Sequence, residues 1–167
     1  PYPAPCGAGA AVTKYHTGAV DNAPGVAGVL EIAAAFAKQQ PAPQRSLLFI
    51  AATLEESGLL GSQYYVAHPS IALARTVAVI NLDAMGVHGR TRDMTVTGLG
   101  SSELEDILKP IALRQGRPLH SESRPQAGSY FRSDHFSFAK AGVPALFVGS
   151  GDDLVDGGKS AGEAASK

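Results

Sequence analysis

Apolar and polar positions follow two different periods along the chain. Residues 46–53 form a near-continuous apolar run, which is typical of a strand covered on both faces. Shorter apolar runs predict further strands over residues 76–82, 94–97 and 143–148, and a polar edge strand over 117–121. The chain is therefore expected to build a sheet whose most buried strand is 46–53.

Apolar residues at helical spacing alternate with these strands. A helix is predicted from Pro24 to Lys38, and prolines in residues 39–44 end it. Further helices are predicted over 61–68, 103–115 and 134–140, with Ser101 or Ser102 capping the second and Ser133 the third. We found no internal repeat and no long linker, so the sequence predicts a single α/β domain over residues 1–167. Residues 1–22 are expected to form an irregular entry segment, and 151–167 a loose C-terminal segment.

Composition narrows the class of protein. A chain of 167 residues with 44% hydrophobic composition can build one ordinary core. The net charge of -1, without any run of lysine or arginine, argues against a nucleic-acid partner. No apolar stretch approaches the ~20 residues that span a bilayer, so no transmembrane segment is expected. Cys6 is the only cysteine, which excludes an internal disulfide and a thiolate metal cage. No feature indicates an oligomeric state.

Acidic residues stand at the ends of two predicted strands. Glu55 and Glu56 follow the run 46–53, and Asp83 follows residues 76–82. Sites in open α/β sheets gather outside the carboxyl ends of the strands. Asp21 lies just before the first helix, where it could act as an N-cap or join the other acids. Four carboxylates at one edge would repel each other unless cations neutralised them, so their conjunction indicates a metal site with a general base.

Four motifs in this order resemble the M28 family of zinc metallopeptidases, which includes bacterial aminopeptidases. They are Gly18-Ala-Val-Asp-Asn-Ala-Pro-Gly25, Leu54-Glu-Glu-Ser-Gly-Leu-Leu-Gly-Ser62, Asn81-Leu-Asp83 and Ser133-Asp-His-Phe-Ser-Phe138. The resemblance implies a mixed, largely parallel central sheet flanked by helices. It also implies hydrolysis of peptide substrates, most simply removal of amino-terminal residues, and an extracytoplasmic or secreted location.

The resemblance implies a role for each acid. Asp21 would bridge two zinc ions, Glu56 would bind one of them and Asp83 the other, and Glu55 would be the catalytic general base. Asp134 and His135 would orient the site without binding metal directly, although simple core packing of His135 remains open.

The chain also departs from the family pattern. The family carries a histidine ligand in a His-x-Asp motif before the bridging aspartate and another histidine after the last matched strand. Neither has a counterpart in this sequence. The chain is therefore expected to be a fragment of the catalytic domain that binds one zinc ion or none. His16 is a possible substitute ligand if its loop folds back towards Asp21.

Two other functions remain open. One is amide chemistry of the glutaminyl-cyclase kind at a single zinc ion on the same scaffold. The other is a non-catalytic binding module that keeps the scaffold without metal. The presence of Glu55 argues against the binding module, because such a module has no use for a general base.

Overall fold

The computed structural model describes residues 18–165, so His16 and most of the expected entry segment lie outside the described residues. The helices are α1 (Ala23–Lys38), α2 (Leu60–Ala67), α3 (Leu104–Arg114), α4 (His135–Lys140) and α5 (Gly158–Ala165). The strands are β1 (Val79–Asn81), β2 (Met94–Thr97), β3 (Leu119–Ser121) and β4 (Ala145–Ser150). Helices and strands are interspersed along the chain, although α1 is followed directly by α2, and β1 by β2.

The four strands form one mixed sheet in the order β1-β4-β2-β3. β1 pairs in parallel with β4, with Asn81 opposite Phe147, and β2 pairs in parallel with β3. β2 and β4 are antiparallel, with Val96 opposite Val148. The prediction of a mixed, largely parallel sheet is confirmed, and β3 lies at the edge as the sequence of 117–121 predicts.

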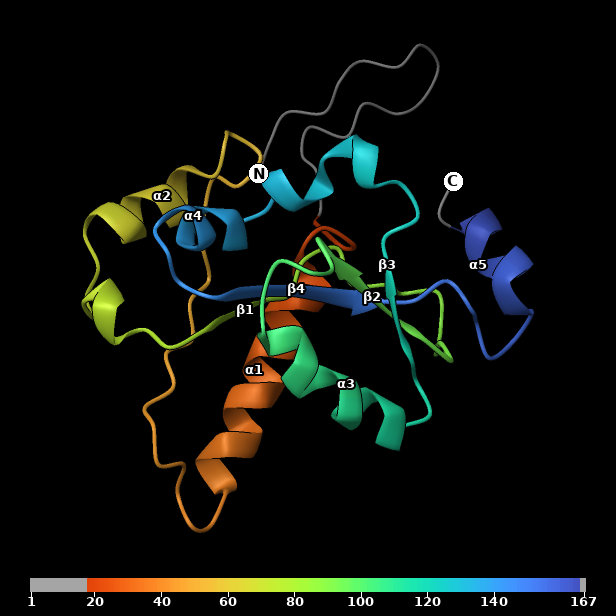
Figure 1. Cartoon of the computed structure of the whole chain (residues 1–167), viewed down its shortest axis with the longest axis horizontal. Coiled ribbons are helices and arrows are strands. Elements are labelled where there is room, and N and C mark those ends of the chain that lie inside the picture. The colour runs from red at the N-terminus through yellow and green to blue at the C-terminus, as the bar shows by residue number, and fades with distance from the viewer. Residues whose placement is uncertain (1–17, 166–167) are drawn as a thin grey trace.

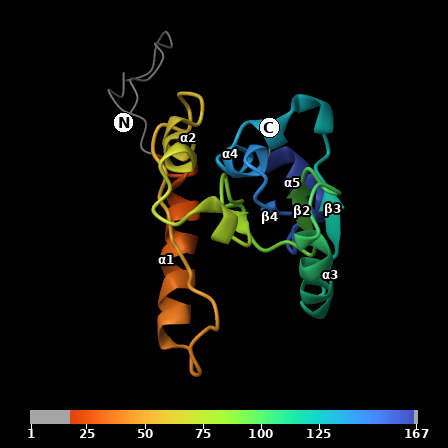
Figure 2. The same cartoon turned by 60° about the vertical axis from the view of Figure 1, so that its left-hand side comes forward.

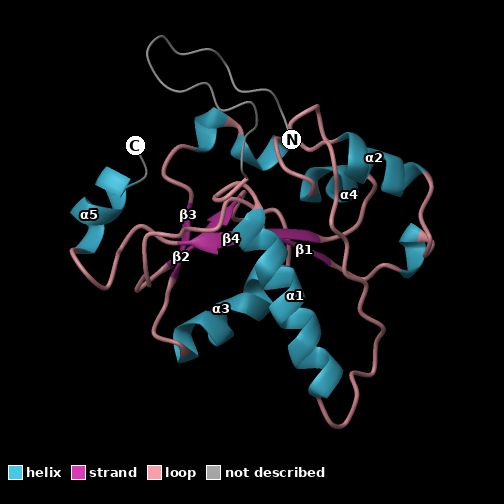
Figure 3. Ribbon diagram, turned by 180° about the vertical axis from the view of Figure 1, so that it is seen from behind, coloured by secondary structure: helices cyan, strands magenta, loops and turns pink. Residues whose placement is uncertain are grey.

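Helices lie around this sheet and position the loops at its ends. α4 packs against α2 and against β1 and β4, while α3 contacts β4. α1 begins beside the sheet and extends away from it (Figures 1 and 3). Figure 2 shows α1 and α2 on one side of the molecule and β2, β3 and α3 on the other. The buried hydrophobic side chains include Val96, Ala112, Phe138, Ala145 and Leu146. Within residues 18–165, no helix is long and apolar enough to cross a membrane.

The prediction of a buried strand over residues 46–53 is wrong. This segment has no strand assignment and pairs with none of the four strands. Leu48 and Phe49 are 56% and 41% exposed. An apolar run shows only that burial of the segment would be favourable, whereas a strand also needs a neighbouring strand to pair with its backbone N–H and C=O groups. Within the described part of the chain, no such neighbour lies beside it.

Other boundaries differ in smaller ways. The strand predicted over 76–82 is confined to β1, because only these residues lie opposite β4. Ser133 does not cap α4. Its hydroxyl instead forms hydrogen bonds with the side chains of Asn81 and Asp83. Asp134 occupies the N-cap position, and its side chain makes no capping hydrogen bond. At α3, Glu103 is the N-cap residue, although the Ser102 hydroxyl accepts a bond from the Leu104 N–H.

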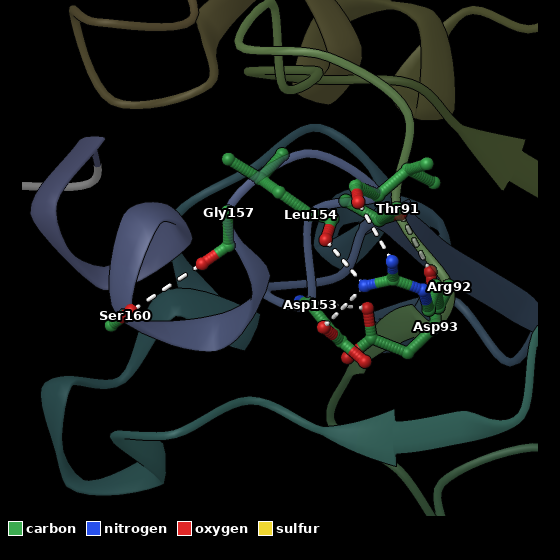
Figure 4. Close-up of polar contacts among 8 residues, drawn as sticks. Thr91, Arg92, Asp93, Asp153, Leu154, Gly157 and Ser160 are labelled. Carbon is green, nitrogen blue, oxygen red and sulfur yellow. Dashed lines mark hydrogen bonds and ion pairs between the residues drawn. The ribbon is translucent and has the colours of Figure 1, made fainter.

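The C-terminal segment is not loose throughout. It contains α5, and an isolated bridge joins Leu154 to Thr91. The Arg92 guanidinium donates to the carbonyls of Leu154 and Val155, at 2.7 Å each, and forms an ion pair with Asp153 at 3.2 Å (Figure 4). The sequence predicted a loose C-terminal segment, but one arginine provides enough donors to hold residues 153–155 beside residues 91–93.

Candidate functional site

The start of α1 places Asp21 beside the end of β1. Asn22, not Asp21, is the N-cap, since its side chain accepts from the Gly25 N–H at 3.0 Å. The alternative that Asp21 caps the helix is therefore wrong. The Asn22 amide also donates to the carbonyl of Leu82 at 2.9 Å, and a Cβ on Gly25 would lie 2.4 Å from the same oxygen. This close approach brings Asp21 to the residue that precedes Asp83 and leaves its carboxylate uninvolved in capping.

A tight turn carries Glu55 and Glu56 from the exposed apolar run into α2. The N–H groups of Gly58 and Leu59 donate to the carbonyl of Glu55, at 3.0 and 2.8 Å. Leu54 has a φ of 57°, a left-handed conformation that is uncommon for a leucine and is found in strained functional turns. The Gly61 N–H donates to the carbonyl of Thr53 at 3.0 Å. A Cβ at position 61 would lie 2.2 Å from the same carbonyl oxygen. The glycine therefore allows α2 to start directly against the preceding segment.

Asp83 follows β1 and is held from the opposite side by the loop that enters α4. The Ser133 hydroxyl donates to Oδ2 of Asp83 and accepts from the side-chain amide of Asn81 at 2.7 Å. Ser133 is 3% exposed. Sequence reasoning missed this contact, although Asn81 and Ser133 both stand inside the motifs that it selected.

The structure brings Asp21, Glu55, Glu56 and Asp83 to one cavity, which Ser133 and Phe136 also line. Burial raises the pKa of Asp21, and the carboxylates of Asp83 and Glu56 raise it further. Burial, followed by the charges of Asp83, Glu56, Asp134 and Asp21, raises the pKa of Glu55 to about 7. All these charges have the same sign, so the cavity favours a bound proton or cation.

Asp134 and His135 line a second cavity that the same four acids also border. Burial raises the pKa of Asp134, a hydrogen bond with Ser62 opposes that shift, and the charge of Asp83 adds to it. His135 is 1% exposed, and within the described residues neither ring nitrogen has a hydrogen-bond partner. Its ring lies 4.8 Å from that of Tyr130 and 4.9 Å from that of Phe147. Burial lowers its pKa to about 4, with Asp83 acting in the opposite direction, so the ring is neutral at pH 7 and packs among aromatic side chains.

The acidic residues fit a divalent cation by charge and donor type, because carboxylate oxygens are ligands of zinc and other divalent metals. Their arrangement, however, does not form a complete set of metal ligands. Among residues 18–165, no group of three or more His, Cys, Asp or Glu side chains is arranged to hold a metal ion. His68, His88 and His120 are exposed, and His16 lies outside the described residues. The structure therefore provides a cluster of carboxylates without an assembled ligand shell.

Fold and site together define an α/β domain with an acidic, cation-attracting cavity at the end of β1. Residues 7–164 match the family model described as Peptidase family M28. The chain belongs to this family, and the resemblance seen in the four sequence motifs is confirmed.

Individual relatives agree with this assignment. The chain is 31% identical over 136 residues to leupeptin-inactivating enzyme 1 of Streptomyces exfoliatus, covering 81% of this chain and 30% of that protein. It is 35% identical over 133 residues to aminopeptidase YwaD of Bacillus subtilis, covering 77% and 28%. The solved structure of a zinc aminopeptidase from Bacillus subtilis superposes with a TM-score of 0.64 and 28% identity, covering 83% of this chain and 34% of that one. The chain thus spans about a third of the length of the relatives that it matches.

Proposed function

We propose that this chain forms part of the catalytic domain of a zinc-dependent aminopeptidase, which hydrolyses the first peptide bond of its substrates. The observation that carries the proposal is the convergence of four carboxyl groups on one cavity, with a pKa of about 7 for Glu55. Membership of family M28 supports it, as do the names of relatives that are aminopeptidases, one of them a zinc enzyme.

Each acid has a separate part in the proposed reaction. Asp21, Glu56 and Asp83 would hold zinc. Zinc supplies Lewis-acid chemistry, which polarises the scissile carbonyl and activates water. Glu55 takes the proton from the attacking water and delivers it to the leaving amine. In the metal-free cavity, burial and the neighbouring acids raise the pKa of Glu55 to about 7. A group with a raised pKa suits this role, because it both accepts and releases a proton near neutral pH.

The same residues lead us to propose weak zinc binding by the chain itself. Three carboxylates are the proposed ligands, and no imidazole in the described residues joins them. Structural and catalytic zinc sites in proteins usually combine at least three protein ligands that include histidine or cysteine. We therefore expect one zinc ion or none per chain at micromolar zinc concentrations.

Zinc titration of three variants tests the proposal. The purified chain, Glu55→Gln, Asp83→Asn and the exposed-site control Glu31→Gln are each titrated with zinc by calorimetry and assayed on an aminoacyl anilide. We expect Asp83→Asn to weaken zinc binding about tenfold or more. Glu55→Gln should keep the zinc affinity and lose roughly 10²–10⁴-fold in rate. Glu31 is an exposed residue of α1, so Glu31→Gln should behave as the wild type does.

Two results would contradict the proposed function, and a third would contradict only the proposed weak zinc binding. One is an Asp83→Asn variant that binds zinc as tightly as the wild type. The second is a Glu55→Gln variant with unchanged turnover. The third is a wild-type chain that binds two zinc ions tightly, which would contradict the proposed weak binding alone. A glutaminyl substrate assayed beside the anilide separates peptide hydrolysis from cyclisation, because cyclisation releases no free amino-terminal glutamine.

A further inference from the structure

Asn81 is the last residue of β1 and does not line the cavity that the four acids share with Ser133. It lies two residues before Asp83, and residues two apart along an extended chain project to the same side. Both side chains meet Ser133, which α4 brings to this side by packing against β1. Asn81, Ser133 and Asp83 therefore form a continuous chain of hydrogen bonds.

The direction of these bonds follows from their chemistry. An ionised carboxylate has no hydrogen to donate, so the single hydroxyl hydrogen of Ser133 must point at Asp83. The oxygen of Ser133 is then free only to accept, and the side chain of Asn81 must offer its N–H and not its carbonyl. The Nδ2 to Oγ distance of 2.7 Å is that of a well-formed bond. A donor at position 81 therefore keeps the hydroxyl hydrogen directed at the carboxylate.

The consequence falls on Asp83. Its Oδ2 is engaged by Ser133, and among the described residues no hydrogen bond is made to Oδ1. Ser133 is almost fully buried, so water does not compete freely for its hydroxyl. One oxygen of Asp83 is thus fixed in place and the other remains free to bind a ligand.

We propose that Asn81 is a positioning residue that acts on Asp83 through Ser133, and so makes Asp83 a single-oxygen ligand of fixed orientation. The proposal rests on the proposed function, in which Asp83 binds zinc. It extends that function to a residue on β1 that needs no contact with metal or substrate. Hydrogen-bond partners of metal ligands commonly affect metal affinity because they orient the ligand.

A double-mutant cycle on zinc affinity tests the route from Asn81 to Asp83. The full chain is compared with Asn81→Leu, Ser133→Ala and the double variant, and zinc dissociation constants are measured by calorimetric titration carried to millimolar zinc, because weak binding is expected. Asn81→Leu keeps the side-chain size and removes the donor. We expect Ser133→Ala to weaken zinc binding about tenfold, and Asn81→Leu about threefold or more. Because both act through the same hydroxyl, the double variant should match Ser133→Ala within about twofold.

Matched controls separate positioning from folding. Ser137→Ala removes a buried hydroxyl of α4, which bonds Ser62 at 2.9 Å and makes no hydrogen bond to Asp83. It should lower the melting temperature without weakening zinc binding. Ser133→Thr retains the hydroxyl and should restore zinc binding relative to the nearly isosteric Ser133→Val. Where turnover is measurable, the Asn81 variant should lower kcat and change KM less than about twofold, since it alters no substrate contact.

The possible outcomes are distinct. Effects that multiply in the double variant would show that Asn81 and Ser133 act independently, and would overturn the proposal. So would an Asn81→Leu variant with wild-type zinc affinity, or a Ser137→Ala variant as weak as Ser133→Ala. If Asp83→Asn binds zinc like the wild type, the proposed metal role of Asp83 itself is wrong. That last result tests the proposed function, whereas the others test the role of Asn81.

Discussion

Replacing Glu55 by glutamine should remove a pH-dependent loss of stability from the metal-free chain. In the folded state, burial and four neighbouring acids raise the pKa of Glu55 from 4.5 to about 7. The folded chain therefore binds this proton more tightly than the unfolded chain does. Between these two pH values the folded state carries more protons, so the free energy of unfolding falls as pH rises through that window.

The magnitude follows from the difference between the two pKa values. A difference from 4.5 to about 7 corresponds to about 3 kcal/mol at about 1.4 kcal/mol per pH unit. Glu55 is only partly buried, and solvent screens part of its interaction with the other acids. We therefore expect a loss on the order of 1–2 kcal/mol between pH 5 and pH 8. Glutamine has nearly the same shape and no titrating proton, so this part of the pH dependence disappears in Glu55→Gln.

The assay is urea unfolding in the presence of a chelator at pH 5, 6, 7 and 8. Wild type, Glu55→Gln and the exposed control Glu31→Gln are compared. The Glu55→Gln variant should be more stable than the wild type at pH 8 and should show a shallower decline from pH 5. Some decline should remain, because burial and the charges of Asp83 and Glu56 raise the pKa of Asp21 in the same direction. Equal slopes for wild type and Glu55→Gln would refute the electrostatic account of the cavity, and so would an equal effect of Glu31→Gln.

Three further predictions concern the scaffold around the site. Gly61→Ala should destabilise the chain by about 1–3 kcal/mol in urea unfolding, because the new Cβ would lie 2.2 Å from the carbonyl of Thr53; an unchanged midpoint would contradict this packing. Val96→Ala should lower the free energy of unfolding by about 1–3 kcal/mol, and Leu48→Ala by less than about 0.5 kcal/mol, because Val96 is 1% exposed and Leu48 is 56% exposed. A larger loss of stability for Leu48→Ala would show that the run 46–53 is buried. Arg92→Ala should change the free energy of unfolding by no more than about 1 kcal/mol but speed amide hydrogen exchange at Val155, whose N–H bonds the carbonyl of Arg90; unchanged exchange there would contradict the anchoring role of Arg92.

Local patterns predicted α1, α2, α3 and α4 well but missed α5. Pro24 and the prolines in residues 39–44 bracket α1, and its observed bounds are Ala23–Lys38. The edge position of β3 followed from its polar sequence. These features depend on backbone restriction and on side chains within one or two turns, and such information is present in the sequence itself.

Contacts between segments far apart in the chain were harder to predict from the sequence. The run 46–53 has the composition of a buried strand, but its exposure depends on which segments lie beside it. Ser133 looked like a helix cap because serine before a helix usually is one. Its hydroxyl instead bonds Asp83, which is 50 residues away along the chain. Likewise, Asp21 and Asn22 are both good caps by type, and only the bond from the Gly25 N–H to the Asn22 side chain shows which of them caps α1.

The sequence by itself determined the family, the α/β class and the acids that could take part in chemistry, because these depend on residue type, order and local periodicity. The tertiary structure decided which acids share a cavity, why the pKa of Glu55 is raised to about 7, and how Asn81 reaches Asp83 through Ser133. Those properties depend on distance and burial between segments far apart in the chain. Electrostatic coupling and hydrogen bonding act across space, whereas a residue pattern records only neighbours along the chain.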